Sequence, residues 1–251
     1  MSRPLLSAVL ITHDAASALG ACLDSLAFCD EIIVVDSGSN DDTVEIAERH
    51  GARVIQSEWR GFGPQKQFAI EQASHDWVLC VDADERVSER LRDSILYELS
   101  NPVRATYRFA RCNRFMGRYL KHGEGYPDWS LRLFDRRAAR WSDDTVHEKV
   151  ITDGAVGTLH GDLLHESAES LETYLTKQNR YSTLAANAAI AAGRRATVMQ
   201  LLLSPALRFV KFYFLRLGLL DGLPGLVHIL VGCTASFAKY AKMLATQGDP
   251  P

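Results

Sequence analysis

The sequence predicts an α/β protein in which helices cover both faces of a parallel sheet. Three observations indicate this fold. Apolar β-rich runs alternate with short segments of helical periodicity, the runs are apolar throughout, and aspartates or hydroxyl residues follow directly where they end. The chain has 251 residues, which is enough for one large core and an appendage. Its apolar content of 47% and charged content of 24% are typical of a folded soluble protein.

The expected elements follow one another at short intervals. Strands are predicted at residues 7–12, 31–36, 53–56 and 77–82, and helices at 17–27, 41–52, 64–73 and 88–99. The second helix begins with acidic residues and ends at Gly51, and the third has Pro64 in its first turn. Ligands of such sheets bind beyond the carboxyl ends of the strands. There the sequence has Thr12-His13-Asp14, Asp36-Ser37-Gly38 and Asp82-Ala83-Asp84.

The stretch WVLCVDADERV places two aspartates, Asp82 and Asp84, at the end of a buried strand. Residues i and i+2 of a strand point the same way, so both carboxylates could converge on one point. Two like charges there repel each other unless a divalent cation such as Mg²⁺ lies between them. The alternative is that Asp82, Asp84 and Glu85 only cap the helix at 88–99. A haloacid-dehalogenase-type phosphatase expects Thr or Val where this chain has Arg86, which argues against that class.

Four segments, read in order, resemble the family 2 glycosyltransferases of GT-A fold. They are SAVLITHD, EIIVVDSGSNDDTVEIAERHGARV, GFGPQKQFAIEQASHDWVLCVDADERVS and LRLFDRRAARWSDDTVHEKV, within residues 5–150. The later segment GDLLHESAESLETYLTKQNRYSTLAA resembles, more loosely, the subgroup that adds a hexose to heptose in the lipopolysaccharide inner core. The resemblance implies a metal-dependent, inverting transfer of a hexose, glucose above all, from a UDP-sugar to a lipid-linked glycan acceptor.

The resemblance also implies roles for particular residues. Thr12 and Asp36 would hold the base and ribose of the nucleotide. Asp82 and Asp84 would bind Mg²⁺ or Mn²⁺, with Asp84 the closer ligand and Asp82 also near the substrate. Two basic residues, Lys66 of PQKQFA and Arg132 of LRLF, would bind the substrate. The family often has Arg-Asn where this chain has Lys66-Gln67, so a solvated helix lysine is the alternative for Lys66.

The transfer also needs a base that takes the proton of the acceptor hydroxyl. The family pattern places an acid ten to twenty residues after LRLF, where this chain has Asp143, Asp144 and Glu148. Glu148 is preferred because it occupies the place of the family's Glu-Asp pair, and Asp128 is the second choice. His147 is a candidate for contact with metal or diphosphate, although a lone histidine is more often structural.

Residues 104–121 contain six basic side chains and no acidic one. Their spacing of three or four is that of one solvated helix face. Alternatively, the cations bind a phosphorylated acceptor or a membrane surface through charge-assisted contacts. Charge alone would also permit nucleic acid, but the family resemblance argues against a nucleic-acid partner.

The predicted domains are a GT-A catalytic domain at residues 1–165 and a helical region at 166–251. Residues 194–242 have seven basic residues and one acid among many Leu, Phe and Tyr, which suits helices lying in a membrane interface. The longest uncharged run, Leu223–Ala238, has 16 residues, short of the roughly 20 that span a bilayer. We expect peripheral attachment to an anionic membrane surface. Helices buried against the catalytic domain and a dimer contact are the alternatives.

The five scattered cysteines and the short apolar run at the N-terminus favour a cytoplasmic location. Together with the expected membrane attachment, this predicts a protein on the cytoplasmic face of the inner membrane. Two other function classes and, within the glycosyltransferases, a second acceptor class are the alternatives. A nucleotidyltransferase would have a basic Gly-rich loop after the first strand, where this chain has THDAASALG. A non-catalytic module would not need Asp82, Asp84 and Glu148. A polyprenyl-phosphate glycosyltransferase often has true membrane spans, for which the uncharged run of 16 residues is short. The sequence leaves open the sugar, the acceptor, the anomeric outcome and the oligomeric state.

Overall fold

The computed structural model describes residues 3–144, 148–166 and 170–248. The chain forms two compact units. The first contains residues 1–111 and 128–166, and the second contains residues 112–127 and 167–251. The second unit therefore includes a short segment from the middle of the chain, which the sequence had placed within the catalytic domain.

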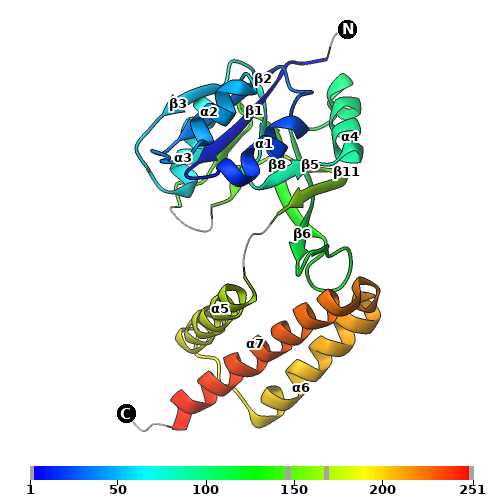
Figure 1. Cartoon of the computed structure of the whole chain (residues 1–251). Coiled ribbons are helices and arrows are strands. Elements are labelled where there is room, and N and C mark those ends of the chain that lie inside the picture. Colours follow the sequence, from blue (N-terminus) through cyan, green and yellow to red (C-terminus); the bar gives the residue numbers. More distant parts are fainter. Residues whose placement is uncertain (1–2, 145–147, 167–169, 249–251) are drawn as a thin grey trace. The chain divides into compact units, whose positions relative to one another are not determined.

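One half of the main sheet is parallel, as Figure 1 shows. Its strands lie in the order β3-β2-β1-β4. They are β1 (Leu6–Thr12), β2 (Glu31–Asp36), β3 (Arg53–Gln56) and β4 (Trp77–Cys80), connected by α1 (Ala16–Ser25), α2 (Thr43–Arg49) and α3 (Phe62–Glu71). These elements confirm the predicted α/β pattern. Because the connections cross over through helices, the carboxyl ends of the strands lie at one edge.

The other half of the sheet is antiparallel, which the sequence did not indicate. The order continues β4-β8-β6-β11-β5, and β8 runs antiparallel to both β4 and β6. The strands are β5 (Glu85–Val87), β6 (Thr106–Phe115), β7 (Arg118–Tyr119), β8 (Asp128–Asp135) and β11 (Val156–His165), and α4 (Glu89–Ser100) lies between β5 and β6. The sheet is therefore mixed. The helical reading of the basic run is also wrong, since most of that run forms β6.

Helices and loops cover both faces of the sheet, as predicted. Along β1, Leu6, Ala8 and Leu10 face a core that also contains Leu23 of α1 and Ile95 of α4. The intervening side chain of Val9 faces the second core. That core contains Ile70 of α3 and Trp141 of β9. The period-2 alternation of a strand buried on both sides explains why β1 is apolar along its whole length.

A small two-stranded sheet of β9 (Ala139–Trp141) and β10 (Val150–Thr152) follows β8. The backbone N–H of Trp141 donates to Gln67 Oε1 at 3.0 Å, which ties this sheet to α3. At its open end, Ser142 N donates to Lys149 O at 2.9 Å. These bonds fix both ends of the loop that carries Glu148.

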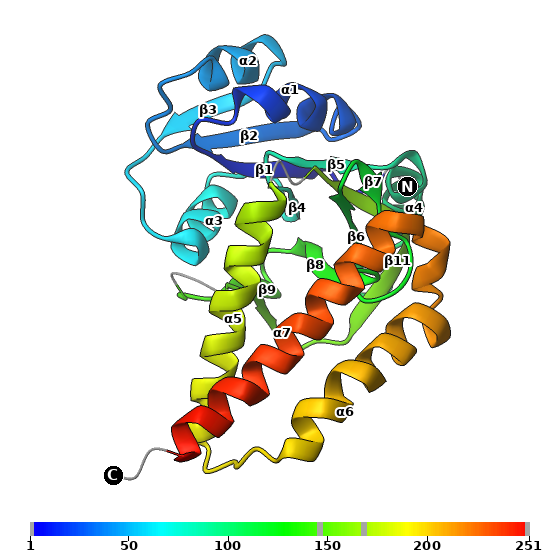
Figure 2. The ribbon, with the colours of Figure 1, turned by 60° about the horizontal axis from the view of Figure 1, so that its bottom comes forward.

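The second unit is helical, as Figure 2 shows. It contains α5 (Leu171–Ala191), α6 (Val198–Phe209), a π-helical turn η1 (Val210–Leu215), a 3₁₀ turn η2 (Gly218–Asp221) and α7 (Gly222–Gly248). Helix α7 packs against both α5 and α6. The carboxylate of Asp221 accepts hydrogen bonds from the backbone N–H groups of Lys121 and His122, and Arg208 pairs with Glu124. These contacts tie residues 112–127 to the helices.

Two segments of this unit are long and apolar enough to cross a membrane, judged by length and composition alone. They are Val198–Leu215, of which none is buried, and Gly218–Gln247, of which a third of the most apolar window is buried. The uncharged run Leu223–Ala238 is thus part of a longer continuous helix, which the sequence count did not include. The expected peripheral attachment stays a prediction.

Candidate active site

A cavity of about 680 Å³ lies in the first unit, at the carboxyl ends of β1 and β4. Its lining comes from segments far apart in the chain: Ile11, Thr12, His13, Ser37, Trp59, Phe62, Lys66, Asp82, Asp84, Glu148 and His165. Ligands of open α/β sheets bind at this edge. The cavity therefore brings together five of the residues that the sequence had singled out, namely Thr12, Lys66, Asp82, Asp84 and Glu148.

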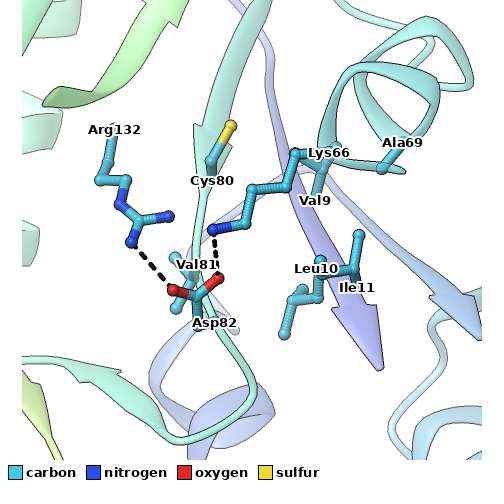
Figure 3. Close-up of a pocket in the computed structure, with 9 residues that line it drawn as sticks. All are labelled: Val9, Leu10, Ile11, Lys66, Ala69, Cys80, Val81, Asp82 and Arg132. Atoms are coloured by element: carbon cyan, nitrogen blue, oxygen red, sulfur yellow. Dashed lines mark hydrogen bonds and ion pairs between the residues drawn. The ribbon is translucent and has the colours of Figure 1, made fainter. Parts of the chain in front are cut away.

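Asp82 lies between two cations, as Figure 3 shows. Lys66 Nζ is 3.0 Å from Asp82 Oδ1, and Arg132 Nη2 donates to Asp82 Oδ2 at 2.8 Å. Burial alone would raise the pKa of Asp82, but Arg132 and Lys66 outweigh it and hold the pKa well below its ordinary value. Arg132 is only 7% exposed and does not line the cavity, so it pairs with Asp82 from the interior of the protein.

Asp84 takes a different partner. Its Oδ2 lies 3.2 Å from His165 Nε2, at the end of β11. Burial tends to lower the pKa of His165, but the hydrogen bond and charge of Asp84 outweigh it and raise this pKa. The two aspartates follow β4 in a turn, so the i, i+2 rule for strands does not apply to them. The carboxylate of Asp84 lines the cavity and is the kind of ligand that suits Mg²⁺ or Mn²⁺.

Glu148 lines the cavity and pairs there with Lys66. Lys66 Nζ donates to Glu148 Oε1 at 2.8 Å and lies 4.9 Å from the ring centre of Trp141. Lys66 is only 7% exposed, so the alternative of a solvated helix lysine is wrong. One ammonium group thus joins the candidate base to the first aspartate of the Asp-x-Asp motif. His147 lies outside the described residues.

Asp128, the second candidate base, lies elsewhere. It begins β8, opposite Arg111 of β6, and Arg111 Nη2 is 2.7 Å from Asp128 Oδ2. Asp128 is not among the described residues that line the cavity. The geometry therefore favours Glu148 of the two.

Thr12 and Asp36 hold each other. Thr12 Oγ1 donates to Asp36 Oδ2 at 2.9 Å, and the N–H groups of Gly38 and Ser39 donate to Asp36 Oδ1. Burial would raise the pKa of Asp36, but the bonds from Ser39, Thr12 and Gly38 keep it low. Asp36 is fully buried, so it shapes the loop after β2, whereas Thr12 and Ser37 line the cavity.

Glu85, the third acid of the opening motif, is part of the support of the site. It is fully buried; its Oε2 accepts from the N–H of Asp82 at 3.0 Å, and its Oε1 lies 3.7 Å from Arg132 Nη2. Burial raises the pKa of Glu85. The N-cap of α4 is Ser88, whose hydroxyl accepts from Leu91 N. The alternative that the three acids only cap this helix is therefore wrong.

Sequence reasoning missed three lining residues. His165 was quoted within LLHES but given no role, and only the pairing of β11 with β5 brings it beside Asp84. Trp59 and Phe62, in the segment that leads into α3, are 50% and 46% exposed, and their rings pack edge to face at 4.9 Å. The available signal in the sequence was the pair of aromatic residues close to the start of the predicted helix at 64–73, since aromatic side chains are suited to contact a ligand.

The family model "Glycosyl transferase family 2" matches residues 7–153 of the chain. The matched region contains Lys66, Asp82, Asp84 and Glu148. This chain belongs to the family 2 glycosyltransferases. It is therefore a glycosyltransferase, as the sequence resemblance implied, and its mixed sheet with a C-terminal helical extension fits that family.

This family 2 glycosyltransferase is similar over almost its whole length to a lipopolysaccharide core biosynthesis glycosyltransferase, LpsC, of Rhizobium meliloti. The two are 34% identical over 95% of this chain and 91% of that protein. An uncharacterized glycosyltransferase of Rickettsia felis is 31% identical over 95% of this chain and 89% of that protein. Both matches extend through the helical unit, so these relatives share more than the catalytic sheet.

Two solved structures are similar to this chain, both with TM-scores below 0.5. TarS of Staphylococcus aureus, residues 1–349, is 15% identical with a TM-score of 0.49, and the match covers 98% of this chain and 92% of that one. Glucosyl-3-phosphoglycerate synthase of Mycobacterium tuberculosis, in a complex with Mn²⁺ and UDP, is 26% identical with a TM-score of 0.37 over 44% of each chain. The family assignment rests on the sequence matches alone.

Proposed function

We propose that this glycosyltransferase moves a hexose, glucose in the first instance, from a UDP-sugar to the lipopolysaccharide core or a related lipid-linked glycan. One observation carries the proposal: Lys66 joins Asp82 to Glu148 inside a cavity of about 680 Å³ at the ligand edge of the sheet. The relative in Rhizobium meliloti, whose name places it in lipopolysaccharide core biosynthesis, supports the acceptor class.

The donor would enter beside Thr12 and Ser37, with the exposed rings of Trp59 and Phe62 at the same cavity. Asp84 would hold a divalent ion, Mg²⁺ or Mn²⁺, together with the phosphate oxygens of the donor, and His165 lies beside it, 3.2 Å from Asp84 Oδ2. When bound, this ion would neutralise charge on the leaving diphosphate. Asp82 is held by Lys66 and Arg132, so its contribution to the ion requires one of these contacts to loosen.

Glu148 would take the proton of the acceptor hydroxyl as that oxygen attacks the anomeric carbon. The ion pair with Lys66 fixes where the Glu148 carboxylate lies, since the two atoms are 2.8 Å apart. Direct attack of this kind inverts the anomeric centre. Lys66 thus has two roles, namely to orient the base and to balance the charge of Asp82.

The basic strand β6 would contribute less to acceptor binding than its charge indicates. Arg111 is engaged with Asp128, and Arg118, just beyond β6, donates to the carbonyl oxygen of Leu220. The guanidinium of Arg108 lies 4.9 Å from the ring centre of Trp129, which is 47% exposed. Of these residues, Arg108 and Trp129 best suit contact with a glycan.

We further propose peripheral attachment to the cytoplasmic face of the inner membrane through the second unit. Large apolar side chains of α6 and η1 are 51% to 76% exposed: Val198, Met199, Leu202, Leu207, Phe214 and Leu215. So large an apolar face in water is a mark of a membrane or protein contact. The segments α6–η1 and α7 are long and apolar enough to cross a membrane. Because enzymes that act on a polyprenyl phosphate often have membrane spans, this lipid is the second candidate acceptor.

Thermal unfolding in the presence of nucleotide-sugars tests the donor. A ligand that binds only the folded state at a hundred times its Kd stabilises it by about 2.7 kcal/mol. We expect UDP-glucose with Mg²⁺ or Mn²⁺ to raise Tm, and the same sugar with a chelator to raise it less. If GDP- and dTDP-sugars stabilise the protein and UDP-sugars do not, the proposed donor is wrong. Product analysis with defined core acceptors then separates a glycan acceptor from a polyprenyl phosphate.

A further inference from the structure

A groove of about 610 Å³ lies within the second unit. It shares no described lining residue with the active-site cavity. Its walls come from α5, from α6 with η1, and from α7, which packs against both. Among the lining residues are three cations, Arg208, Lys211 and Lys239. None of the described residues that line it is acidic.

The cations differ in how far their charge is already balanced. Arg208 pairs with Glu124, so its charge is largely offset. Within the described part of the chain, Lys211 and Lys239 have no carboxylate partner. Each of these ammonium groups lies instead over an aromatic ring, 5.1 Å from the centre of Phe212 and 5.2 Å from that of Tyr240. The groove therefore carries a net positive charge on side chains that the rings hold in place.

The helix that forms one wall has two distinct faces. Ser204, Arg208 and Lys211 lie three or four residues apart, and this face lines the groove. Val198 and Leu202, two exposed apolar side chains of α6, lie on the same helix outside the groove lining. Lys211 and Phe212, which also line this wall, belong to the π-helical turn η1, and π-helical geometry is frequent at functional sites.

We propose that this groove binds the phosphate headgroup of an anionic phospholipid while the apolar side chains of α6 enter the acyl region beside it. The inference deepens the proposed membrane attachment, on which it rests, because it replaces diffuse attraction by one binding site. The charge of Lys211 and Lys239 complements a phosphate, and Tyr181 and Tyr240 at the groove are amphipathic residues that favour the membrane interface. A zwitterionic headgroup such as that of phosphatidylcholine also contains a phosphate, but its own ammonium group offsets that charge and would repel the two lysines.

Matched double variants distinguish a site from diffuse charge. Lys211→Gln with Lys239→Gln removes two cations of the groove. Arg194→Gln with Arg195→Gln removes two exposed cations between α5 and α6, outside the groove lining. Two cations near an anionic surface are together worth about a thirtyfold change in affinity. We expect the groove pair to lose about that factor in binding to phosphatidylglycerol-containing vesicles, and the control pair to lose less than about threefold.

A soluble short-chain phosphatidylglycerol, below its critical micelle concentration, provides the second measurement. Titrated into the full chain, it should bind saturably to the wild type and the control pair and only weakly to the groove pair. The phosphatidylcholine analogue should bind none of them well. Equal losses in both variant pairs, or no saturable binding of the soluble lipid, would overturn the proposal. A wild-type dimer that dissociates in the groove pair would overturn it too.

Folding and the donor are checked separately. The midpoint of thermal unfolding shows whether each variant is folded, and if the groove pair is not, the single changes Lys211→Gln and Lys239→Gln should each cost about fivefold. Stabilisation of the wild type by UDP-glucose is measured in parallel. Its absence would count against the proposed donor and leave the groove untouched. A wild type that binds no vesicles would overturn both the membrane attachment and the groove, whereas equal losses in the two variant pairs would overturn the groove alone.

Discussion

Replacing Glu148 by glutamine is the most direct test of the proposed chemistry. The amide keeps the size of the side chain, and its oxygen can still accept a hydrogen bond from Lys66, now 2.8 Å from Glu148 Oε1. It cannot take a proton from an acceptor hydroxyl at neutral pH. General-base catalysis contributes about 10²- to 10⁴-fold, so kcat should fall by that factor. The KM for the donor should change little.

The stability of this variant should change much less than its activity. Lys66 retains its contact with Asp82 at 3.0 Å, so the buried ammonium group does not become unpaired. Replacing the carboxylate acceptor of Lys66 by a neutral amide oxygen should cost about 1 to 2 kcal/mol in the free energy of unfolding. Urea unfolding measures this cost, and initial rates of UDP release with acceptor present measure kcat.

Asp128→Asn is the matched control, because it also removes one carboxylate that pairs with a cation, here Arg111 at 2.7 Å. We expect this variant to retain most of its kcat, since Asp128 is not among the described lining residues of the cavity. If Asp128→Asn loses the large factor and Glu148→Gln does not, the roles given to the two acids must be exchanged.

Three further predictions follow from the same geometry. Asp84→Asn should abolish the metal-dependent part of the Tm shift by UDP-glucose, because the ion loses its charged ligand; a normal shift would refute the metal assignment. Gly63→Ala should lower kcat at least tenfold and destabilise the fold by about 1 to 3 kcal/mol, because a Cβ would overlap the carbonyl oxygens of Ser142 and Asp144 in the loop that carries Glu148; unchanged kinetics and Tm would contradict this. Glu31 is partly buried, but hydrogen bonds from Ser7 and Ser74 outweigh burial and lower its pKa to about 2. Its stabilisation is therefore present above the ordinary pKa of about 4.3 and lost as pH falls toward 2, so the deficit of Glu31→Gln, up to about 3 kcal/mol at pH 7, should vanish across that window; a deficit independent of pH would contradict the shift.

The parallel half of the fold was predictable because its signals are local. Leu19, Cys22, Leu23 and Leu26 have helical spacing, and all four are buried. Each apolar run is short, rich in β-branched residues and followed within a few residues by its turn, and these features together separate the strands from the helices between them. The position of Asp82 at the ligand edge followed from the rule for parallel sheets, whereas Lys66, inside α3, was indicated only by the family resemblance.

The antiparallel half and part of the site depend on pairing between distant segments. The partner of Asp84 is His165, 81 residues later, and that of Asp82 is Arg132, 50 residues later. Neither pairing leaves a periodic signal in the chain. In β6, the arginines at positions 108, 111 and 114 are three apart, which imitates a helix face although they alternate between the faces of a strand. Spacing of charges is therefore weaker than spacing of apolar residues as a signal of secondary structure.

The charges of the cavity explain why a cation would be needed for the donor. Asp82, Asp84 and Glu148 are acidic, and Lys66 and Arg132 are the strong bases that face Asp82. Every positive charge of this set is therefore already paired with a carboxylate. A UDP-sugar would bring two more negative charges into a site where burial strengthens repulsion. His165, whose raised pKa reflects Asp84, would supply a positive charge only while protonated, and a divalent ion held by Asp84 would supply two at any pH where it binds. Binding of a UDP-sugar beside the two aspartates would therefore be favoured by a divalent cation that enters together with the diphosphate.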